Sequence, residues 1–391
     1  MLKKITAATA AIGLFFGTMG YATSTVEANV GNVTTALKSN KTVLFTKEWI
    51  EGFGRDELSC TGPAEDPYVW REAGHGSNFN YLLLAWANAI VEGRNDLSVI
   101  VNTDKFYSLT KCDVASNGVE TRGGWPCIFT PMPHLCTFDD EQGWVHYNQK
   151  RGLSQEEQDA AAGRNIVPYF SRQMRAIQAA IADSGVGWID VVAMLYDYLH
   201  SHLQPWFKAD VQAILDEPDI NTLRMEKYVS MHIRRGDKKI EVKHTATKAY
   251  LETVAKYLAD SPGGLSAADI RGIWLSTDEE VVLDEVKALA PTFFPNINPE
   301  AIICVTSRVA VRPMVRDQVE GPTSRNTYEA TVLLRLELQM LAGGEVFSGT
   351  FSSNLGRVVA LMRHTLHKPE QSTLSADGRR WFPARKRRLR T

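Results

Sequence analysis

Four charged residues lie close together near the middle of the chain: Arg234, Arg235, Asp237 and Lys238. Each guanidinium is a planar fork that can bond two oxygens of one phosphate group, so two adjacent arginines suit a diphosphate. Asp237 is a possible proton acceptor, and Lys238 adds a third cation. The cluster therefore indicates chemistry on a phosphorylated ligand. The alternative interpretation is that these residues form an ordinary charged turn exposed to solvent.

The residues before this cluster predict the element that positions it. Tyr228, Val229, Met231 and Ile233 favour a β-strand, and the run breaks at Gly236. The cations then follow the carboxyl end of a strand, which is where open α/β sheets bind ligands.

Two further predicted strands also end in polar residues. The strand 273–276 runs into Thr277 and Asp278. The strand 345–348 runs into a hydroxyl-rich loop, 350–354, that opens a helix. Hydroxyls and unpaired N–H groups at a helix N-terminus bind anions, and Arg357 lies one turn inside this helix, within reach of the same anion. The three strand ends together predict a site for a phosphorylated ligand between two domains.

The second half of the chain alternates between strand and helix patterns, which predicts a doubly wound parallel α/β sheet. The expected strands are 228–233, 273–276, 301–305 and 345–348, and the expected helices are 247–258, 279–289, 328–341 and 355–366. In the first half, a loop containing Gly74 and Gly76 opens a helix over 81–91, a buried strand follows at 97–101, and the pattern over 154–216 is mostly helical.

A chain of 391 residues is too long for one compact core, so we expect two domains. They are an N-terminal α/β domain with a helical insertion, residues 29–220, and a Rossmann-like domain, residues 221–370. The net charge of −2 argues against a nucleic-acid-binding fold.

Both ends of the chain have distinctive compositions. Residues 1–28 have a short basic start, an apolar stretch and small residues around Ala28, which predicts a secretory signal peptide or, alternatively, a short membrane anchor. Residues 371–391 form a basic tail, which we expect to be disordered.

Entry into the secretory pathway would place the cysteines in an oxidising compartment. Cys60, Cys112, Cys127 and Cys136 can form two disulfides with three possible connectivities, of which we favour Cys60–Cys136 with Cys112–Cys127. Cys304 lies in an apolar run and is expected to be a buried strand thiol.

The strand-end motifs resemble those of a known enzyme family. His232-Ile-Arg-Arg-Gly-Asp-Lys238, the segment 273–278 and the segment 350–357 are similar, in order and spacing, to the motifs of the α1,6-fucosyltransferases. That family includes the animal enzyme that adds core fucose to N-glycans and the rhizobial nodulation fucosyltransferase. Gly74-His-Gly76 and the segments 123–125, 135–137 and 204–206 also have counterparts, so the resemblance covers roughly residues 60–367.

The resemblance implies GDP-fucose as the donor, a GT-B-like fold of two domains, inversion at the transferred carbon and no metal cofactor. The sequence is consistent with the last point, because it contains no Asp-x-Asp triad to hold a diphosphate through a cation. Guanidinium groups must then stabilise the leaving GDP, and Arg235 with Arg234 is the expected pair.

The resemblance also assigns individual roles. His232, Thr277 and Asp278 should lie beside the nucleotide, and Glu337 should accept the N1 and N2 protons of guanine. The diphosphate or the sugar should be bound by residues of two loops: Gly74, Gly76, Ser352, Ser353, Asn354 and Arg357.

The general base is less well defined by the motifs. The family has a Glu four residues after the motif Lys and a His four residues further on, whereas this chain has Glu241 and His244 at spacings of three and three. Glu241 and Asp237 therefore both remain candidates, with Lys238 holding the acceptor or the base. The SH3-like domain and coiled-coil stem of the animal enzyme have no counterpart here, so its acceptor specificity does not carry over.

The expected function is that of an inverting fucosyltransferase of the secretory pathway, in the Golgi lumen or secreted, that forms an α1,6 linkage on a GlcNAc-containing glycan. The alternatives are a protein O-fucosyltransferase-like enzyme and a non-catalytic relative that binds nucleotide or glycan. The expected partners are the nucleotide sugar and the glycan, with no nucleic acid and membrane contact only through an N-terminal anchor.

Overall fold

The computed structural model describes residues 68–69, 79–80, 82–87, 97–101, 128–130, 132, 135–139, 187–235, 245–260, 264–304 and 328–379. These residues all belong to one compact unit, Val43–Thr391. Several predictions fall outside the described residues: the signal or anchor 1–28, most of the basic tail, Gly74, Gly76, Asp237, Lys238, Glu241, Cys60, Cys112 and Cys127. The disulfide pairing therefore stays a prediction.

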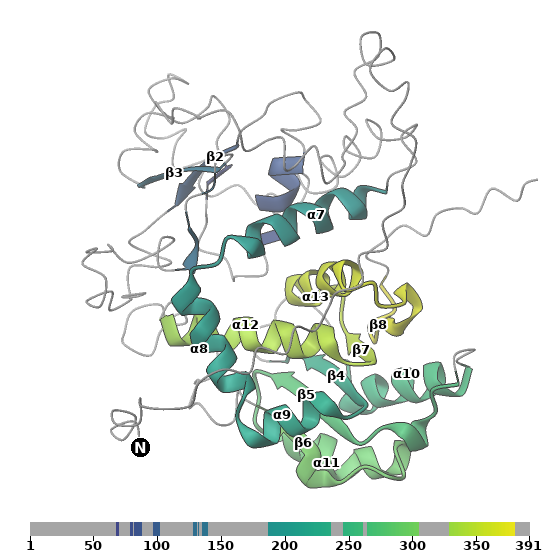
Figure 1. Ribbon diagram of the computed structural model, residues 1–391. Coiled ribbons are helices and arrows are strands. Elements are labelled where there is room, and N and C mark those ends of the chain that lie inside the picture. Colours follow the sequence, from purple (N-terminus) through teal and green to yellow (C-terminus); the bar gives the residue numbers. More distant parts are fainter. Residues whose placement is uncertain are drawn as a thin grey trace, which may run out of the picture. The chain divides into compact units, whose positions relative to one another are not determined.

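The C-terminal part is a parallel sheet of five strands in the order β6-β5-β4-β7-β8 (Figure 1). The strands are β4 (Tyr228–Ile233), β5 (Gly272–Thr277), β6 (Ile302–Cys304), β7 (Val346–Gly349) and β8 (Thr373–Ser375). Every residue of β4 and β5 is buried, as expected for parallel strands covered on both faces. The predicted α/β fold with a doubly wound parallel sheet is confirmed, and Cys304 is buried as expected.

Helices cover both faces of this sheet. They are α10 (Thr247–Asp260), α11 (Val281–Phe293), α12 (Tyr328–Gly343) and α13 (Asn354–Thr365). The odd-numbered residues of β4 share one core cluster with α10 and α11. On the opposite face, the Tyr228 hydroxyl donates to the carbonyl of Met340 (2.9 Å), and the Ser230 hydroxyl donates to that of Leu341 (2.6 Å), both on α12. The alternation of side chains along one strand thus separates the two helical layers.

The edge strand β8 was not predicted, because three residues are too few to show a pattern. It lies in the stretch assigned to the basic tail, and residues 373–375 pair in parallel with β7. The buried Arg363 of α13 holds this edge together: its guanidinium donates to the carbonyl oxygens of Ala342 (3.0 Å) and Gly344 (2.6 Å) and to the hydroxyl of Ser372 (2.6 Å). Burial lowers the pKa of Arg363 to about 10, so it remains a cation at neutral pH.

The N-terminal part contains a parallel sheet of three strands, β1 (Tyr68–Val69), β2 (Leu97–Val101) and β3 (Leu135–Asp139). The predicted strand at 97–101 is confirmed, and the predicted helix 81–91 is helical over 82–87. Three helices then lead to β4: α7 (Trp188–Ser201), α8 (Pro205–Leu215) and α9 (Pro218–Met225). Pro205 begins α8 because its fixed φ and missing N–H suit the first turn of a helix.

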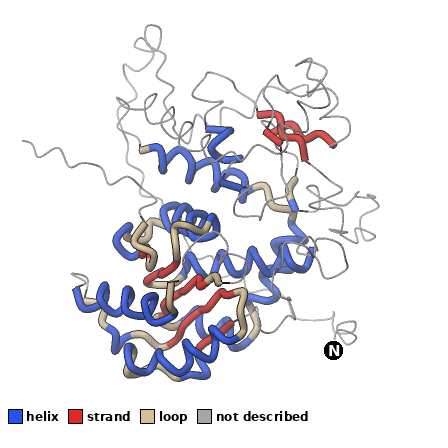
Figure 2. The backbone as a smooth tube through the Cα atoms, turned by 180° about the vertical axis from the view of Figure 1, so that it is seen from behind, coloured by secondary structure: helices blue, strands red, loops and turns tan. Residues whose placement is uncertain are grey.

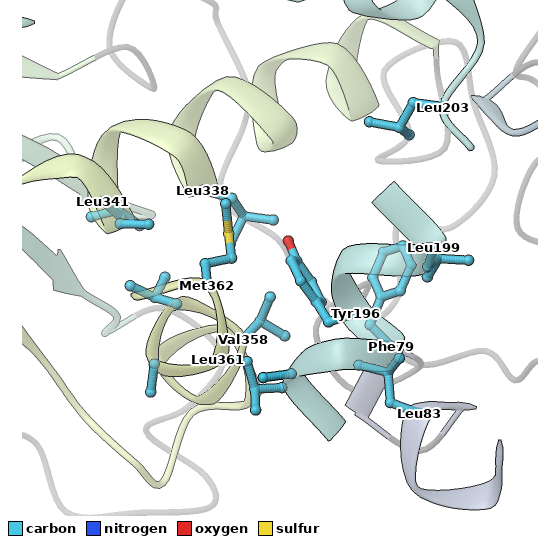
Figure 3. Close-up of a cluster of buried hydrophobic side chains, with 14 of the residues drawn as sticks. Phe79, Leu83, Tyr196, Leu199, Leu203, Leu338, Leu341, Val358, Leu361 and Met362 are labelled. Carbon is cyan, nitrogen blue, oxygen red and sulfur yellow. The ribbon is translucent and has the colours of Figure 1, made fainter. Parts of the chain in front are cut away.

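One continuous hydrophobic core joins these segments, and Figure 3 shows part of it in detail. Figure 2 gives the backbone trace of the same helices and strands from behind. Phe79 and Leu83 pack with Tyr196 of α7, and the same cluster includes Leu338 of α12 and Leu361 of α13. The segment 79–87 is thereby fixed against the helices that flank the C-terminal sheet. Among the described helices, none combines the length and apolar composition needed to cross a bilayer.

Candidate functional site

The strand order places a topological switch point between β4 and β7. The chain leaves β4 through α10 on one face of the sheet, and it enters β7 from α12 on the other face. Met231 pairs with Ser348, so three residues further along each strand Arg234 and Phe351 reach the same edge. A crevice forms outside the carboxyl ends of strands at such a point, and this is where doubly wound sheets bind ligands.

Helix α13 begins at this edge without a side-chain cap. Its N-cap residue, Ser353, makes no capping hydrogen bond, and its hydroxyl is buried with no partner. A serine at this position ordinarily accepts a hydrogen bond from an N–H group of the first turn. Here the Ser353 hydroxyl makes no such bond, so the N–H groups of the first turn have no side-chain cap. Gly356 permits the close approach of helix and loop, because a Cβ there would collide with the carbonyl oxygen of Thr350.

Two side chains fix Asn354, the first residue of α13. Its Oδ1 accepts from Nη1 of Arg357 (3.2 Å) and from Nδ2 of Asn80 (3.4 Å), so its amide N–H groups must point elsewhere. Arg357 also donates from Nε to the carbonyl of Phe351 (2.8 Å), and it therefore braces the loop that it was expected to share with an anion. Asn80, which is 1% exposed, was not predicted as a site residue, because a polar residue at the end of a predicted loop gives no signal of its partner.

The loop between β7 and α13 is also held by a carboxylate from the C-terminal segment. Asp377 accepts hydrogen bonds from the backbone N–H groups of Phe351 (3.3 Å) and Ser352 (3.0 Å) and from the hydroxyl of Ser375. Burial alone would raise the pKa of Asp377, but these hydrogen bonds outweigh it and hold the pKa below its usual value. The sequence offered no signal for this residue, which lies in the stretch assigned to the tail.

The two adjacent arginines at the end of β4 have different surroundings. Arg235 lies over α10 and α11, where Nη1 donates to Glu285 Oε1 (2.9 Å), Nη2 lies 2.5 Å from Glu285 Oε2, and the guanidinium also contacts the hydroxyl of Thr247. Hydrogen bonding by Arg235 lowers the pKa of Glu285, so this pair is ionised. Arg234 keeps 27% of its side chain exposed and lies 3.8 Å from Asp278 through Nε.

Asp278 and Thr277 organise the turns at this edge. Asp278 Oδ1 accepts the backbone N–H of Arg235 (2.9 Å), which ties the end of β5 to the end of β4. The Thr277 hydroxyl accepts from the backbone N–H of Glu279 (3.3 Å) and so shapes the turn into α11. Both residues lie where the sequence placed them, at the strand ends, and their contacts here are with the protein.

His232 is buried one residue before the end of β4. It is 5% exposed, and its Nδ1 has no hydrogen-bond partner. Burial, with a smaller contribution from Arg234, lowers its pKa to about 3, so the ring is neutral at physiological pH. A neutral imidazole with an unpaired nitrogen can accept or donate one further hydrogen bond.

Glu337 lies half-buried on α12, the helix above the Tyr228–Ser230 face of β4. Since α12 returns the chain to the start of β7, it runs opposite to the strands. The Ser230 hydroxyl of β4 donates to the carbonyl of Leu341 on α12. Glu337 lies one turn before Leu341 on the helix, and His232 lies two residues after Ser230 on the strand. The topology therefore carries Glu337 and His232 toward the same edge of the sheet.

The predicted site residues that the structure describes lie at three adjacent strand ends and on the helices α12 and α13: His232, Arg234, Arg235, Thr277, Asp278, Glu337, Ser352, Ser353, Asn354 and Arg357. Within the described ranges, no group of three or more His, Cys, Asp or Glu side chains is arranged as metal ligands would be. The unpaired Ser353 hydroxyl, the N-terminus of α13 and the partly exposed guanidinium of Arg234 are groups of the kind that bind an anion.

Comparisons with known proteins are limited to distant structural likenesses. No family model and no curated protein matches the chain. A mutant of Arabidopsis thaliana FUT1 in complex with GDP has a TM-score of 0.41 and 12% identity, and the match covers 81% of this chain and 72% of that one. POFUT1 in complex with GDP-fucose has a TM-score of 0.39 and 11% identity, over 80% of this chain and 99% of that one. Because both TM-scores lie below 0.5, we draw no argument from these likenesses.

Proposed function

We propose that this protein is an inverting glycosyltransferase that transfers fucose from GDP-fucose to a glycan. The observation that carries the proposal is the uncapped N-terminus of α13 at the switch point, with the buried, unpaired Ser353 hydroxyl beside it. A site of this kind binds the phosphates of a nucleotide. The resemblance of the strand-end motifs to those of α1,6-fucosyltransferases supports fucose as the transferred sugar and α1,6 as the linkage.

In this proposal the diphosphate lies between Arg234 and the start of α13. Arg234 is the arginine of the adjacent pair whose guanidinium is the more exposed, while Arg235 holds the end of β4 through Glu285. Negative charge grows on the β-phosphate as the bond to fucose breaks, so the guanidinium and the helix dipole act most strongly at the transition state. Loss of one such donor typically costs about 10²–10³ in rate.

The guanine base is proposed to lie between α12 and the end of β4. The carboxylate of Glu337 would accept the N1 and N2 protons of guanine, a pair of donors that adenine lacks. The neutral ring of His232 offers a flat, uncharged surface for the nucleoside, since burial keeps the pKa of His232 far below neutrality.

The acceptor hydroxyl needs a base, and the proposed base is Glu241 or Asp237. Both lie in the sequence between the end of β4 and the start of α10, outside the described residues. Because β4 ends at the carboxyl edge of the sheet, where the donor is proposed to bind, a carboxylate that follows β4 in the sequence is the natural candidate for the base.

The test is a transfer assay with GDP-fucose and three kinds of acceptor: an N-glycan, a chitooligosaccharide and a folded peptide domain with Ser or Thr. Transfer to either glycan, with the new linkage determined by NMR, is the expected result. Transfer only to the peptide would favour a protein O-fucosyltransferase. Activity with UDP-sugars and none with GDP-fucose would overturn the proposal.

A further inference from the structure

The C-terminal segment that follows α13 returns to the proposed donor loop and binds it. Strand β8 pairs with β7, and the backbone N–H of Ala376 donates to the carbonyl of Gly349 (2.8 Å). One residue later, Asp377 places its carboxylate on the N–H groups of Phe351 and Ser352. A sheet edge and a largely buried carboxylate therefore hold the first half of the loop from one side.

The carboxylate of Asp377 is almost fully occupied by donors. Besides Phe351 and Ser352, it accepts from the hydroxyl of Ser375 and from the backbone N–H of Arg379 (3.2 Å), and its side chain is 9% exposed. Charge-assisted hydrogen bonds to backbone N–H groups are the strong kind, and several together fix the position of a loop. Such an arrangement is unsuited to a general base, because a base needs a free lone pair and a pKa near the working pH.

The position of Asp377 also determines which groups of the loop remain for a ligand. The N–H groups of Phe351 and Ser352 are already paired with a carboxylate. The Ser353 hydroxyl, the Asn354 amide and the N–H groups of the first turn of α13 are then the donors left over. The Phe351 and Ser352 half of the loop is thus held in place by Asp377, and the Ser353 and Asn354 half keeps its donors for the ligand.

We propose that Asp377 is a positioning residue that holds the 350–353 loop so that Ser353 and the N-terminus of α13 face the diphosphate of the donor. The proposal rests on the proposed function for the identity of the ligand. It predicts that removing the Asp377 charge changes the affinity for the diphosphate in the direction opposite to that expected from electrostatics alone. Removing a negative charge near a diphosphate should strengthen binding if charge alone matters, whereas loss of a positioning contact should weaken it.

The experiment compares the wild type with Asp377→Asn, Ser375→Ala and the control Glu370→Gln. Glu370 is an exposed carboxylate of the same C-terminal segment, so its neutralisation controls for charge. Hydrogen–deuterium exchange of the peptide covering 349–357 reports on the loop, and calorimetric titration with GDP reports on binding. Ser375→Ala removes one hydroxyl and serves as the milder variant if Asp377→Asn does not fold.

We expect faster exchange of the 349–357 peptide and about ten- to hundredfold weaker GDP binding in Asp377→Asn, smaller changes of the same sign in Ser375→Ala, and no change in Glu370→Gln. Unchanged exchange, or GDP binding that is equal to or tighter than that of the wild type, would overturn the proposal. If the wild type itself binds no GDP, the proposed function fails, and the exchange rates alone decide whether Asp377 holds the loop.

Discussion

Replacement of Arg235 by alanine should destabilise the protein, whereas replacement of Arg234 should weaken GDP binding with little effect on stability. The side chain of Arg235 is 13% exposed and that of its partner Glu285 is 36% exposed, so the pair lies between a buried and a surface ion pair. Breaking a buried pair costs about 3–5 kcal/mol, and an exposed pair contributes about 0.2–1 kcal/mol. For Arg235→Ala we therefore expect a loss of about 1–2 kcal/mol in the free energy of unfolding.

Thermal unfolding with and without GDP measures both effects. A loss of 1 kcal/mol lowers Tm by about 2–4 °C in a domain of about 150–250 residues, so Arg235→Ala should melt several degrees below the wild type. Arg234, with 27% of its side chain exposed and an ion-pair distance of 3.8 Å, should change Tm by no more than an exposed pair would. In Arg234→Ala, the further rise in Tm that GDP produces should be reduced or lost.

A double-mutant cycle with Glu285→Gln tests the pairing itself. The two single substitutions should be non-additive, because each removes the same bidentate contact. Exposed Glu252, which pairs with Lys248 at 3.2 Å, provides the control Glu252→Gln. Additive effects of Arg235→Ala and Glu285→Gln, or an equal loss of Tm in Arg234→Ala, would refute the reasoning.

Three further predictions concern stability. Arg363→Met should lower the free energy of unfolding by more than about 3 kcal/mol in denaturant titrations, because it leaves buried carbonyl oxygens unpaired; a loss below about 1 kcal/mol would contradict this. Gly356→Ala should cost about 1–3 kcal/mol, since its Cβ meets the carbonyl oxygen of Thr350, and wild-type stability in a chemical melt would disprove that close fit. Burial lowers the pKa of His232 to about 3. The neutral ring therefore makes its full contribution to stability above the pKa of about 6.5 that it has in the unfolded chain. As the pH falls from there toward 3, the free energy of unfolding decreases by at most about 1.4 kcal/mol per pH unit. His232→Gln should flatten this pH dependence in unfolding measurements, and an unchanged slope would show that other groups cause it.

Much of the C-terminal sheet could be predicted because most of its strands are short, mainly apolar runs that end in polar residues. The strand 228–233 was predicted at its observed bounds for this reason. Helix α11 was expected from residue 279 and begins at Val281, because Thr277 and Glu279 form a turn of their own. The strand β8 was missed, since pairing with β7 and not its own pattern makes those three residues a strand.

The site could be predicted at the level of strand ends but not at the level of contacts. Sequence spacing placed Arg234 and Arg235 together, and it could not separate their roles, because that depends on Glu285, which is 50 residues away. Asn80 is 274 residues from Asn354 in the chain, and only the packing of the segment 79–87 against α13 brings them together. Interactions between distant residues of this kind leave no local pattern in a sequence.

The central claim is that the edge formed by Arg234, Ser353 and the start of α13 binds the diphosphate of a guanine nucleotide. Calorimetric titration of the wild type and of Ser353→Ala with GDP and with UDP tests it most directly. We predict binding of GDP, much weaker binding of UDP, and a clear loss of GDP affinity in Ser353→Ala with an unchanged Tm in the absence of nucleotide. Equal affinity for GDP in the wild type and Ser353→Ala, or no binding of either nucleotide, would contradict the claim.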